Sequence, residues 1–129
     1  MTLALIDSPE APAAIGPYSH AVSTGDMIFV SGQLPLDPAT GEMVGAAPAD
    51  ELRQSLKNAQ AVLTTAGVSL RDVVKTTVFV TDLSAFAAIN AAYAEIFGDH
   101  APARSVVEVS ALPRGARVEV ELIACKRSA

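Results

Sequence analysis

The sequence predicts one α+β domain in which a single β-sheet packs against two helices. The chain has 129 residues, a length that suits one domain of ordinary size. Apolar residues make up 50% of it and charged residues 18%, a composition that excludes intrinsic disorder. Two stretches repeat apolar residues at three- and four-residue steps, and five others are short and rich in β-branched residues, which indicates helices and strands respectively. We therefore treat residues 1–129 as one domain.

An extended arm and a hairpin are expected at the N-terminal end. Residues 1–15 contain two prolines and no basic side chain. This composition predicts an extended arm rather than a signal peptide, and hence a cytoplasmic protein. Residues 21–24 and 27–31 flank Gly25-Asp26, a dipeptide typical of a two-residue β-hairpin loop. A further turn is expected within residues 36–44, where Pro and Gly recur.

A helix over residues 49–66 and a strand over residues 71–81 form the middle of the chain. Pro48 lies at the start of the helix and Gly67 follows its end, as is usual at helix termini. The strand is β-branched and has apolar residues on both faces. Val74, Val78 and Val80 are expected on one face, and Val73 and Phe79 on the other.

The second helix is expected over residues 85–97, and two more strands follow it. Ser84 is the candidate N-cap of this helix and Gly98 its C-terminal stop. Strands predicted at residues 105–109 and 117–125 complete the order β-β-α-β-α-β-β, which is typical of an α+β layer pair. The positions of the helix expected to face inward are Phe86, Ile89, Tyr93, Ile96 and Phe97.

The predicted strands carry more apolar surface than two helices can cover. Two helices cover one face of a sheet, yet residues 27–30 and 118–125 place apolar side chains on both faces. A sheet face that is open to water is normally polar. Because the mean hydropathy is also high, at +0.36, we expect the second face to be buried against other copies of the chain.

The composition argues against several classes of function. The net charge is −5 and no basic patch is present, so nucleic-acid binding through phosphate contacts is not expected. No apolar run reaches the roughly 20 residues of a membrane-spanning helix. No metal-ligand or phosphate-binding motif occurs, so we expect neither a metal nor a cofactor. The single cysteine, Cys125, lies in an apolar strand and is expected to be a buried small hydrophobe rather than a reactive thiol.

Four side chains remain as candidates for chemistry, each with an ordinary structural alternative. Arg104 could clamp a carboxylate with two parallel hydrogen bonds, or simply lie on the surface. Glu119 could orient a water, or belong with Glu121 to the polar stripe of an edge strand. Tyr18 could donate a hydrogen bond from its hydroxyl, or its ring could only pack against neighbouring side chains. Asn90 could support a site or lie on an ordinary helix flank. Together they suggest a site for a small anionic molecule.

Six short motifs follow one another along residues 14–125. They are Gly16-Pro17-Tyr18-Ser19-His20-Ala21-Val22, Ser31-Gly32-Gln33-Leu34-Pro35, Val74 to Val80 with Asp82-Leu83, Asn90-Ala91-Ala92-Tyr93, Pro102-Ala103-Arg104-Ser105, and Leu112-Pro113 with Val118-Glu119-Val120-Glu121. In this order they resemble the motifs of the reactive intermediate deaminase family (RidA, formerly YjgF), and of its archetypal branch.

The resemblance implies a fold, an assembly and an activity. The fold is chorismate-mutase-like, with a mixed six-stranded sheet and two helices packed on one face. The assembly is a homotrimer with sites in clefts between subunits. The activity is the hydrolytic deamination of the enamine and imine products of pyridoxal-phosphate dehydratases, typically 2-iminobutanoate and 2-iminopropanoate, to 2-keto acids and ammonia.

The resemblance also implies roles for individual residues. Arg104 is expected to bind the substrate carboxylate, and Glu119 to hold and polarise the attacking water. Tyr18 is expected to supply a hydroxyl from a neighbouring subunit. The substrate-binding residues that the resemblance implies are Ser31, Gly32, Asn90 and Val106.

The chain departs from the pattern of the family at two places. Many bacterial members carry a cysteine where this chain has Val106, which leaves only a main-chain contact to the imine nitrogen. The loop at residues 98–101 is short and lacks the aromatic residue that often precedes the arginine motif, so we expect a more open pocket. The alternatives are a non-catalytic ligand-binding or chaperone-like trimer, and a deaminase of another enamine such as aminoacrylate. An endoribonuclease is a further alternative, against which the net charge argues.

Overall fold

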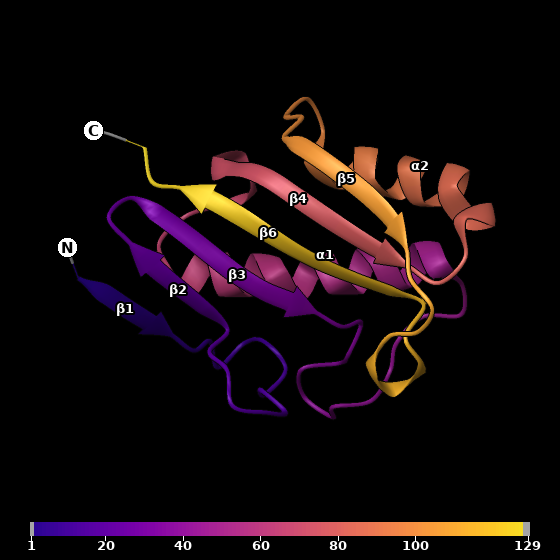
Figure 1. Cartoon of the computed structure of the whole chain (residues 1–129), viewed down its shortest axis with the longest axis horizontal. Helices are drawn as coiled ribbons and strands as arrows, with labels where there is room; N and C mark the ends of the chain where they lie inside the picture. The colour runs from indigo at the N-terminus through magenta and orange to yellow at the C-terminus, as the bar shows by residue number, and fades with distance from the viewer. Residues whose placement is uncertain (1, 128–129) are drawn as a thin grey trace.

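The computed structural model describes residues 2–127 and contains one β-sheet with two α-helices on one of its faces (Figure 1). The strands are β1 (Leu3–Ile6), β2 (Ala21–Thr24), β3 (Met27–Gln33), β4 (Val73–Val80), β5 (Ala103–Glu108) and β6 (Val118–Cys125). The helices are α1 (Pro48–Thr65) and α2 (Phe86–Phe97), and the connections contain the 3₁₀ turns η1 (Leu70–Asp72), η2 (Leu83–Ala85) and η3 (Pro113–Gly115).

The six strands lie in the order β1-β2-β3-β6-β4-β5 across the sheet. Neighbouring strands are antiparallel except for β4 and β5, which are parallel. Figure 1 shows both helices on the same side of the sheet, with α1 across its middle strands and α2 toward the β5 edge. The prediction of a mixed six-stranded α+β sheet with two helices is therefore confirmed.

The hydrophobic core lies between the helices and the face of the sheet that they cover. Alternate residues of the strands point into it, as a pleated strand requires. Burying each large apolar side chain stabilises the fold by about 1.5–3 kcal/mol relative to leaving it exposed. Fully buried members include Ile28 of β3, Val78 of β4, Val118 and Val120 of β6, and Leu52, Leu56 and Leu63 of α1.

Two glycines end or reverse elements where the backbone must turn. Gly25, with φ of 56°, lies in the two-residue loop between β2 and β3. Gly67, with φ of 85°, follows α1. The amides of Gly67 and Val68 donate to the carbonyls of Thr64 and Leu63, each at 3.0 Å, which forms a Schellman motif. The predicted hairpin and the predicted end of the first helix are both confirmed.

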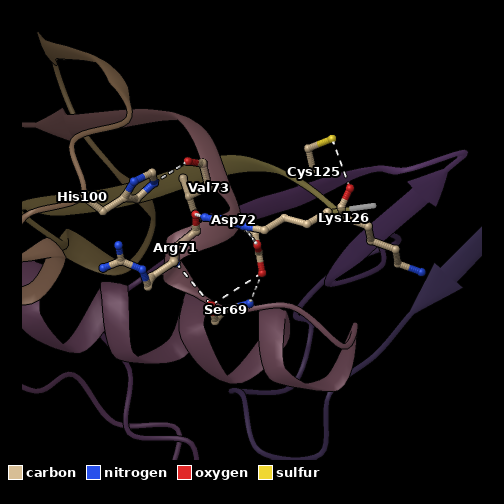
Figure 2. A network of polar contacts seen from close by, with 8 residues as sticks. Ser69, Arg71, Asp72, Val73, His100, Cys125 and Lys126 are labelled. Atoms are coloured by element: carbon tan, nitrogen blue, oxygen red, sulfur yellow. Dashed lines mark hydrogen bonds and ion pairs between the residues drawn. The ribbon is translucent and has the colours of Figure 1, made fainter. Parts of the chain in front are cut away.

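A polar network fixes the chain between α1 and β4 (Figure 2). The amide of Ser69 donates to the Asp72 carboxylate at 2.9 Å, and the Arg127 guanidinium donates to the same carboxylate at 2.7 Å. The main-chain donor at Ser69 and then the Arg127 guanidinium hold the pKa of Asp72 below its ordinary value. Beside them the His100 ring donates to the carbonyl of Val73 at 2.8 Å, which ties the start of β4 to the loop before β5.

A β-bulge changes the predicted faces of β4. The register against β6 shifts between Val73 and Lys75. Val73 is 1% exposed and lies in the core, whereas Val74 is 44% exposed. The prediction that Val74 shares a face with Val78 and Val80 is therefore wrong, because the extra residue of a bulge reverses the alternation on one side of it.

The start of α2 also differs from the prediction. Asp82, rather than Ser84, is the cap, since its carboxylate accepts a hydrogen bond from the Ser84 amide at 2.9 Å and starts the turn η2. The helix itself begins at Phe86, which is 39% exposed. The expectation that Phe86 faces inward is wrong, because the first residue of α2 lies beyond the part of the helix that covers the core.

The face of the sheet away from the helices carries exposed apolar side chains. Phe29 of β3 and Val107 of β5 are 45% and 40% exposed. Cys125 is partly exposed on this face, so the prediction that it is buried is wrong for a single chain. Among the described residues, no helix has both the length and the apolar character needed to cross a membrane.

The predicted N-terminal arm is partly strand. Its residues Leu3–Ile6 form the edge strand β1, which pairs with β2. The rest of the arm is anchored by His20, whose side chain is buried. The Ser8 amide donates to His20 Nδ1 at 2.9 Å, and His20 Nε2 donates to the Pro12 carbonyl at 2.8 Å. These two bonds require the neutral tautomer with its hydrogen on Nε2, and they hold the arm across the end of the sheet.

Candidate active site

A cavity of about 330 Å³ opens between the N-terminal arm and the ends of β3 and β6. Four of the predicted site residues line it, namely Tyr18, Ser31, Gly32 and Glu119. The structure therefore brings together residues that lie about a hundred positions apart in the chain. We call this space the first cavity.

The exit of β3 forms the floor of the first cavity. The pairing of β3 with β6 shifts after Val30, so Ser31 and Gly32 lie in an irregular stretch. The Ser31 hydroxyl donates to the Ser19 carbonyl at 2.7 Å, which ties the floor to the N-terminal arm. A Cβ atom on Gly32 would lie 2.7 Å from Glu119 Oε2. Glycine is therefore the residue that leaves room for the carboxylate.

Glu119 supplies a carboxylate to the first cavity. It lies in β6 opposite Phe79 of β4, on the face away from the helices, and Glu121 lies two residues further along on the same face. Burial, and to a smaller extent the charge of Glu121, raises the pKa of Glu119 above its ordinary value. A half-buried carboxylate with a raised pKa is suited to accept and return a proton.

Tyr18 lies at the open side of the first cavity. Its amide donates to the Gly16 carbonyl at 2.9 Å, which forms a tight turn around Pro17. Its hydroxyl accepts a hydrogen bond from the Ile15 amide at 3.4 Å. This bond is long and exposed, so the hydroxyl can exchange it for a ligand at small cost.

Arg104 lies on the opposite face of the sheet, against α2. Its Nη1 donates to Asn90 Oδ1 at 2.7 Å, and its Cζ lies 4.8 Å from the centre of the Tyr93 ring and 5.8 Å from that of Phe86. Phe86, Asn90 and Tyr93 follow one another along α2 at steps of four and three residues, so they lie on one face of the helix. Val106 follows Arg104 on the same face of β5 and packs against the core.

A second cavity, of about 380 Å³, lies beside Arg104. The end of α2 and the short loop at residues 98–101 form its walls, with His100 and Ala101 among the lining residues. Arg104 and His100 give this cavity cationic and hydrogen-bonding groups, whereas the first cavity contains a carboxylate and hydroxyls. The two cavities are thus complementary in charge.

The predicted site residues fall into two groups that a single chain keeps apart. Tyr18, Ser31, Gly32 and Glu119 line the first cavity, whereas Arg104 borders the second with Asn90 and Val106 on its side of the sheet. Within residues 2–127, no cluster of three or more His, Cys, Asp or Glu side chains is arranged to hold a metal ion.

Sequence reasoning missed several residues that shape these cavities. His20 and Gln33 lie in the motifs without a predicted role, and both line the first cavity. The sequence predicts Tyr93 only as a core residue, whereas in the structure its ring also lies against the Arg104 guanidinium. The helical spacing of Phe86, Asn90 and Tyr93 is the signal that could have identified the surroundings of Arg104.

Comparison with known proteins identifies the family. The sequence profile described as Endoribonuclease L-PSP matches residues 8–126. A RutC family protein of Sinorhizobium fredii is 52% identical over 118 residues, which cover 92% of this chain and 94% of that protein. The 2-iminobutanoate/2-iminopropanoate deaminase of Escherichia coli is 50% identical over 125 residues, which cover 95% of this chain and 97% of that protein. The crystal structure of Escherichia coli TdcF with bound serine matches with a TM-score of 0.91 and 44% identity, over 96% of this chain and 99% of that one. The chain therefore belongs to the endoribonuclease L-PSP family, the YjgF/RidA family that its six motifs resemble.

Proposed function

We propose that this protein hydrolyses 2-imino acids, with 2-iminobutanoate and 2-iminopropanoate as substrates, to 2-keto acids and ammonia. The observation that carries the proposal is the charge complementarity of the two cavities. A protonated 2-imino acid has an anionic carboxylate next to a cationic C=N group. The Arg104 guanidinium can bind the carboxylate. The Glu119 carboxyl, whose pKa is raised, can act on the cationic C=N group. A relative that is 50% identical bears the name of this activity.

In this proposal Arg104 binds the substrate carboxylate. A guanidinium has five N–H donors in a planar fork, and Asn90 accepts a hydrogen bond from Nη1. Other donors of the fork can form two parallel hydrogen bonds with a carboxylate. The related structure of TdcF is described as having serine bound, and serine has the same carboxylate next to its α-carbon.

Glu119 holds and polarises the attacking water. The water oxygen bonds to the imine carbon while Glu119 takes up one of its protons, and the proton then passes to the nitrogen. The C–N bond then breaks, ammonia leaves with its electron pair, and the hydroxyl proton passes to Glu119 as the carbonyl of the 2-keto acid forms. Because 2-imino acids are labile in water, positioning and modest proton transfer suffice. Tyr18 donates a hydrogen bond from its hydroxyl to the reacting centre. Ser31 and Gly32 form the floor of the first cavity.

The reaction requires Arg104 and Glu119 to face the same substrate, although they lie on opposite faces of one sheet. We therefore propose a homotrimer with chorismate-mutase-like packing, in which each site lies between subunits. Arg104, Asn90 and Val106 come from one subunit, and Tyr18 and Glu119 both come from its neighbour. The exposed apolar face of the sheet supplies the surface that such an assembly buries.

Val106 limits the chemistry available beside Arg104, since its side chain has no polar atom. The imine nitrogen can be contacted there only by the main chain of β5, and no step involves a thiol. The same residues would hydrolyse aminoacrylate, which also has a carboxylate next to its carbon–nitrogen bond. Although the family description names an endoribonuclease, the net charge of −5 disfavours the phosphate contacts that RNA binding requires.

A coupled assay tests the proposal. Threonine dehydratase generates the imine, semicarbazide traps it, and the protein lowers the yield of semicarbazone. Arg104→Ala should lower kcat/KM by about 30-fold or more, because breaking a desolvated charge pair costs at least about 2 kcal/mol. Arg53→Ala is the matched control, since Arg53 forms exposed ion pairs with Asp50 and Glu95 and should leave the rate unchanged.

Three outcomes would contradict the proposal. Equal activity of the wild type and Arg104→Ala would exclude the carboxylate clamp. Tight binding of a 2-keto acid without hydrolysis of any imine would favour a non-catalytic binding protein. RNA cleavage that falls steeply with salt would favour the nuclease.

A further inference from the structure

We propose that Thr76 is a positioning residue for Arg104 and acts through the ring of Tyr93. The inference rests on the proposed role of Arg104 as the carboxylate clamp, and it identifies a residue that determines how well the clamp binds. Thr76 has an exposed fraction of 0%, so it cannot touch substrate itself. It lies in β4 in register with Arg104 of β5, which places both side chains on the same face of the sheet.

The hydroxyl of Tyr93 is tethered to Thr76. The two side-chain oxygens lie 2.7 Å apart, in a buried hydrogen bond between α2 and β4. Burial raises the pKa of Tyr93 and outweighs the opposing effects of Thr76 and Arg104, so the phenol is neutral at physiological pH. The ring is therefore held at its Cβ end by α2 and at its hydroxyl end by β4, and it has little freedom to tilt.

A fixed ring gives the guanidinium a fixed support. Arg104 Cζ lies 4.8 Å from the centre of the Tyr93 ring, within the range of a cation–π contact. The hydrogen bond to Asn90 Oδ1 fixes one point of the fork, but a single bond leaves the guanidinium free to rotate. The ring fixes its plane, so the donors that would meet a carboxylate are oriented before it binds.

The expected consequence is a loss of binding rather than of chemistry. Without the tether, the ring and the guanidinium sample other orientations, and each must be ordered again when a carboxylate binds. Glu119, which lies on the opposite face of the sheet, is unaffected. Thr76 variants should therefore raise KM and leave kcat unchanged, whereas loss of a purely structural hydrogen bond would lower thermal stability without changing KM.

The test uses three variants of the chain and one matched control variant. Thr76→Val replaces the hydroxyl with a methyl group of similar shape, and Tyr93→Phe removes the other oxygen. Each change should raise KM for the imine by about five- to tenfold, and should raise Kd for 2-oxobutanoate, measured by calorimetry, by the same factor. This factor corresponds to the size of a cation–π contribution. The kcat of each variant should stay within about twofold of the wild type. Thr76→Ser keeps the hydroxyl, so its KM and Kd should equal those of the wild type. Thr77→Val is the matched control, because this neighbour points to the other face of β4 and should change neither.

The double variant and the remaining outcomes complete the test. Thr76→Val combined with Tyr93→Phe should raise KM no more than either change alone, since both remove the same bond. Unchanged KM and Kd in both single variants, while Arg104→Ala still lowers kcat/KM by about 30-fold or more, would overturn the positioning role and leave the proposed function intact. An Arg104→Ala variant with wild-type activity would instead overturn the proposed function. If Thr76→Val does not fold, Tyr93→Phe and Thr76→Ser decide the question.

Discussion

Adding one methyl group at Gly32 should displace the Glu119 carboxylate from the first cavity. In Gly32→Ala the new Cβ would lie 2.7 Å from Oε2, 2.9 Å from Cδ and 3.3 Å from Cγ of Glu119. Atoms in favourable contact lie about 3.5–4.0 Å apart, so the carboxylate oxygen must retreat by about 1 Å. The displaced atoms are the flexible end of a side chain, which makes the movement cheap for the fold.

The displacement should lower activity far more than stability. A misplacement of about 1 Å in a catalytic group costs about 100-fold in rate, so we expect kcat to fall by about 10- to 100-fold, equivalent to about 1.4–2.7 kcal/mol in the barrier. KM should change little, because the atoms that the new Cβ meets belong to Glu119, whereas Arg104 of the neighbouring subunit binds the substrate carboxylate in the proposed assembly. The free energy of unfolding should change by less than about 1 kcal/mol, since the new methyl also restricts the unfolded chain.

The semicarbazide assay and urea unfolding measure the two quantities. Gly16→Ala is a matched control, since a Cβ there would lie an ordinary 3.6 Å from the Tyr18 ring, and its kcat should be unchanged. In a Glu119→Gln background, Gly32→Ala should cause no further loss. The same fold-loss in that background would refute the reasoning, because the methyl would then act through another group. An unchanged kcat in the wild-type background would refute it as well.

Three further predictions follow from the charges and the core. Glu121→Gln removes a like charge that helps to raise the pKa of Glu119. The acid limb of the kcat–pH profile, where Glu119 becomes protonated, should therefore move to lower pH. An acid limb that does not move would contradict the proposed role of Glu119 in proton transfer. Asp72 has a lowered pKa, so its stabilising effect is present above the ordinary pKa of about 4 and is lost as the pH falls through the lower folded value. Asp72→Asn should therefore lower the free energy of unfolding in urea by roughly 1 kcal/mol at pH 7 and by progressively less in acid. An equal loss at pH 7 and in acid would contradict this role of Asp72. Leu56→Ala, at a site with 0% exposure, should cost about 2–5 kcal/mol, and a loss below 1 kcal/mol would mean that the core closes around the cavity.

Most elements could be predicted because their hydrophobic periods are local properties of the chain. The helix expected at residues 49–66 is Pro48–Thr65, and the one expected at 85–97 is Phe86–Phe97. Strand β1 was not predicted as a strand, because four residues at an exposed edge have no diagnostic pattern and are ordered by pairing with β2. The face of Val74 was mispredicted for a related reason, since a bulge is set by the register with the neighbouring strand.

Four of the predicted site residues line one cavity of the structure, but the sequence does not predict how these four are placed relative to Arg104. Alternation along a strand puts Arg104 and Val106 on one face, and Glu119 and Glu121 on one face, from the sequence alone. It does not relate the faces of two strands, because that depends on which side of each strand packs against the helices. The structure puts Arg104 on the α2 side and Glu119 on the other side. This difference is the reason why the proposed site lies between two subunits.

The sequence by itself determined the fold class and the two helices, and it identified Arg104 and Glu119 as the candidates for binding a carboxylate and a water, because these depend on composition, spacing and short motifs. The tertiary structure alone decided that Gly32 makes room for Glu119, that Thr76 tethers the ring beneath Arg104, and that the two charged groups face opposite sides of the sheet. These features arise from contacts between segments far apart in the chain. Such contacts are set by the packing of the whole core, and no local pattern encodes them.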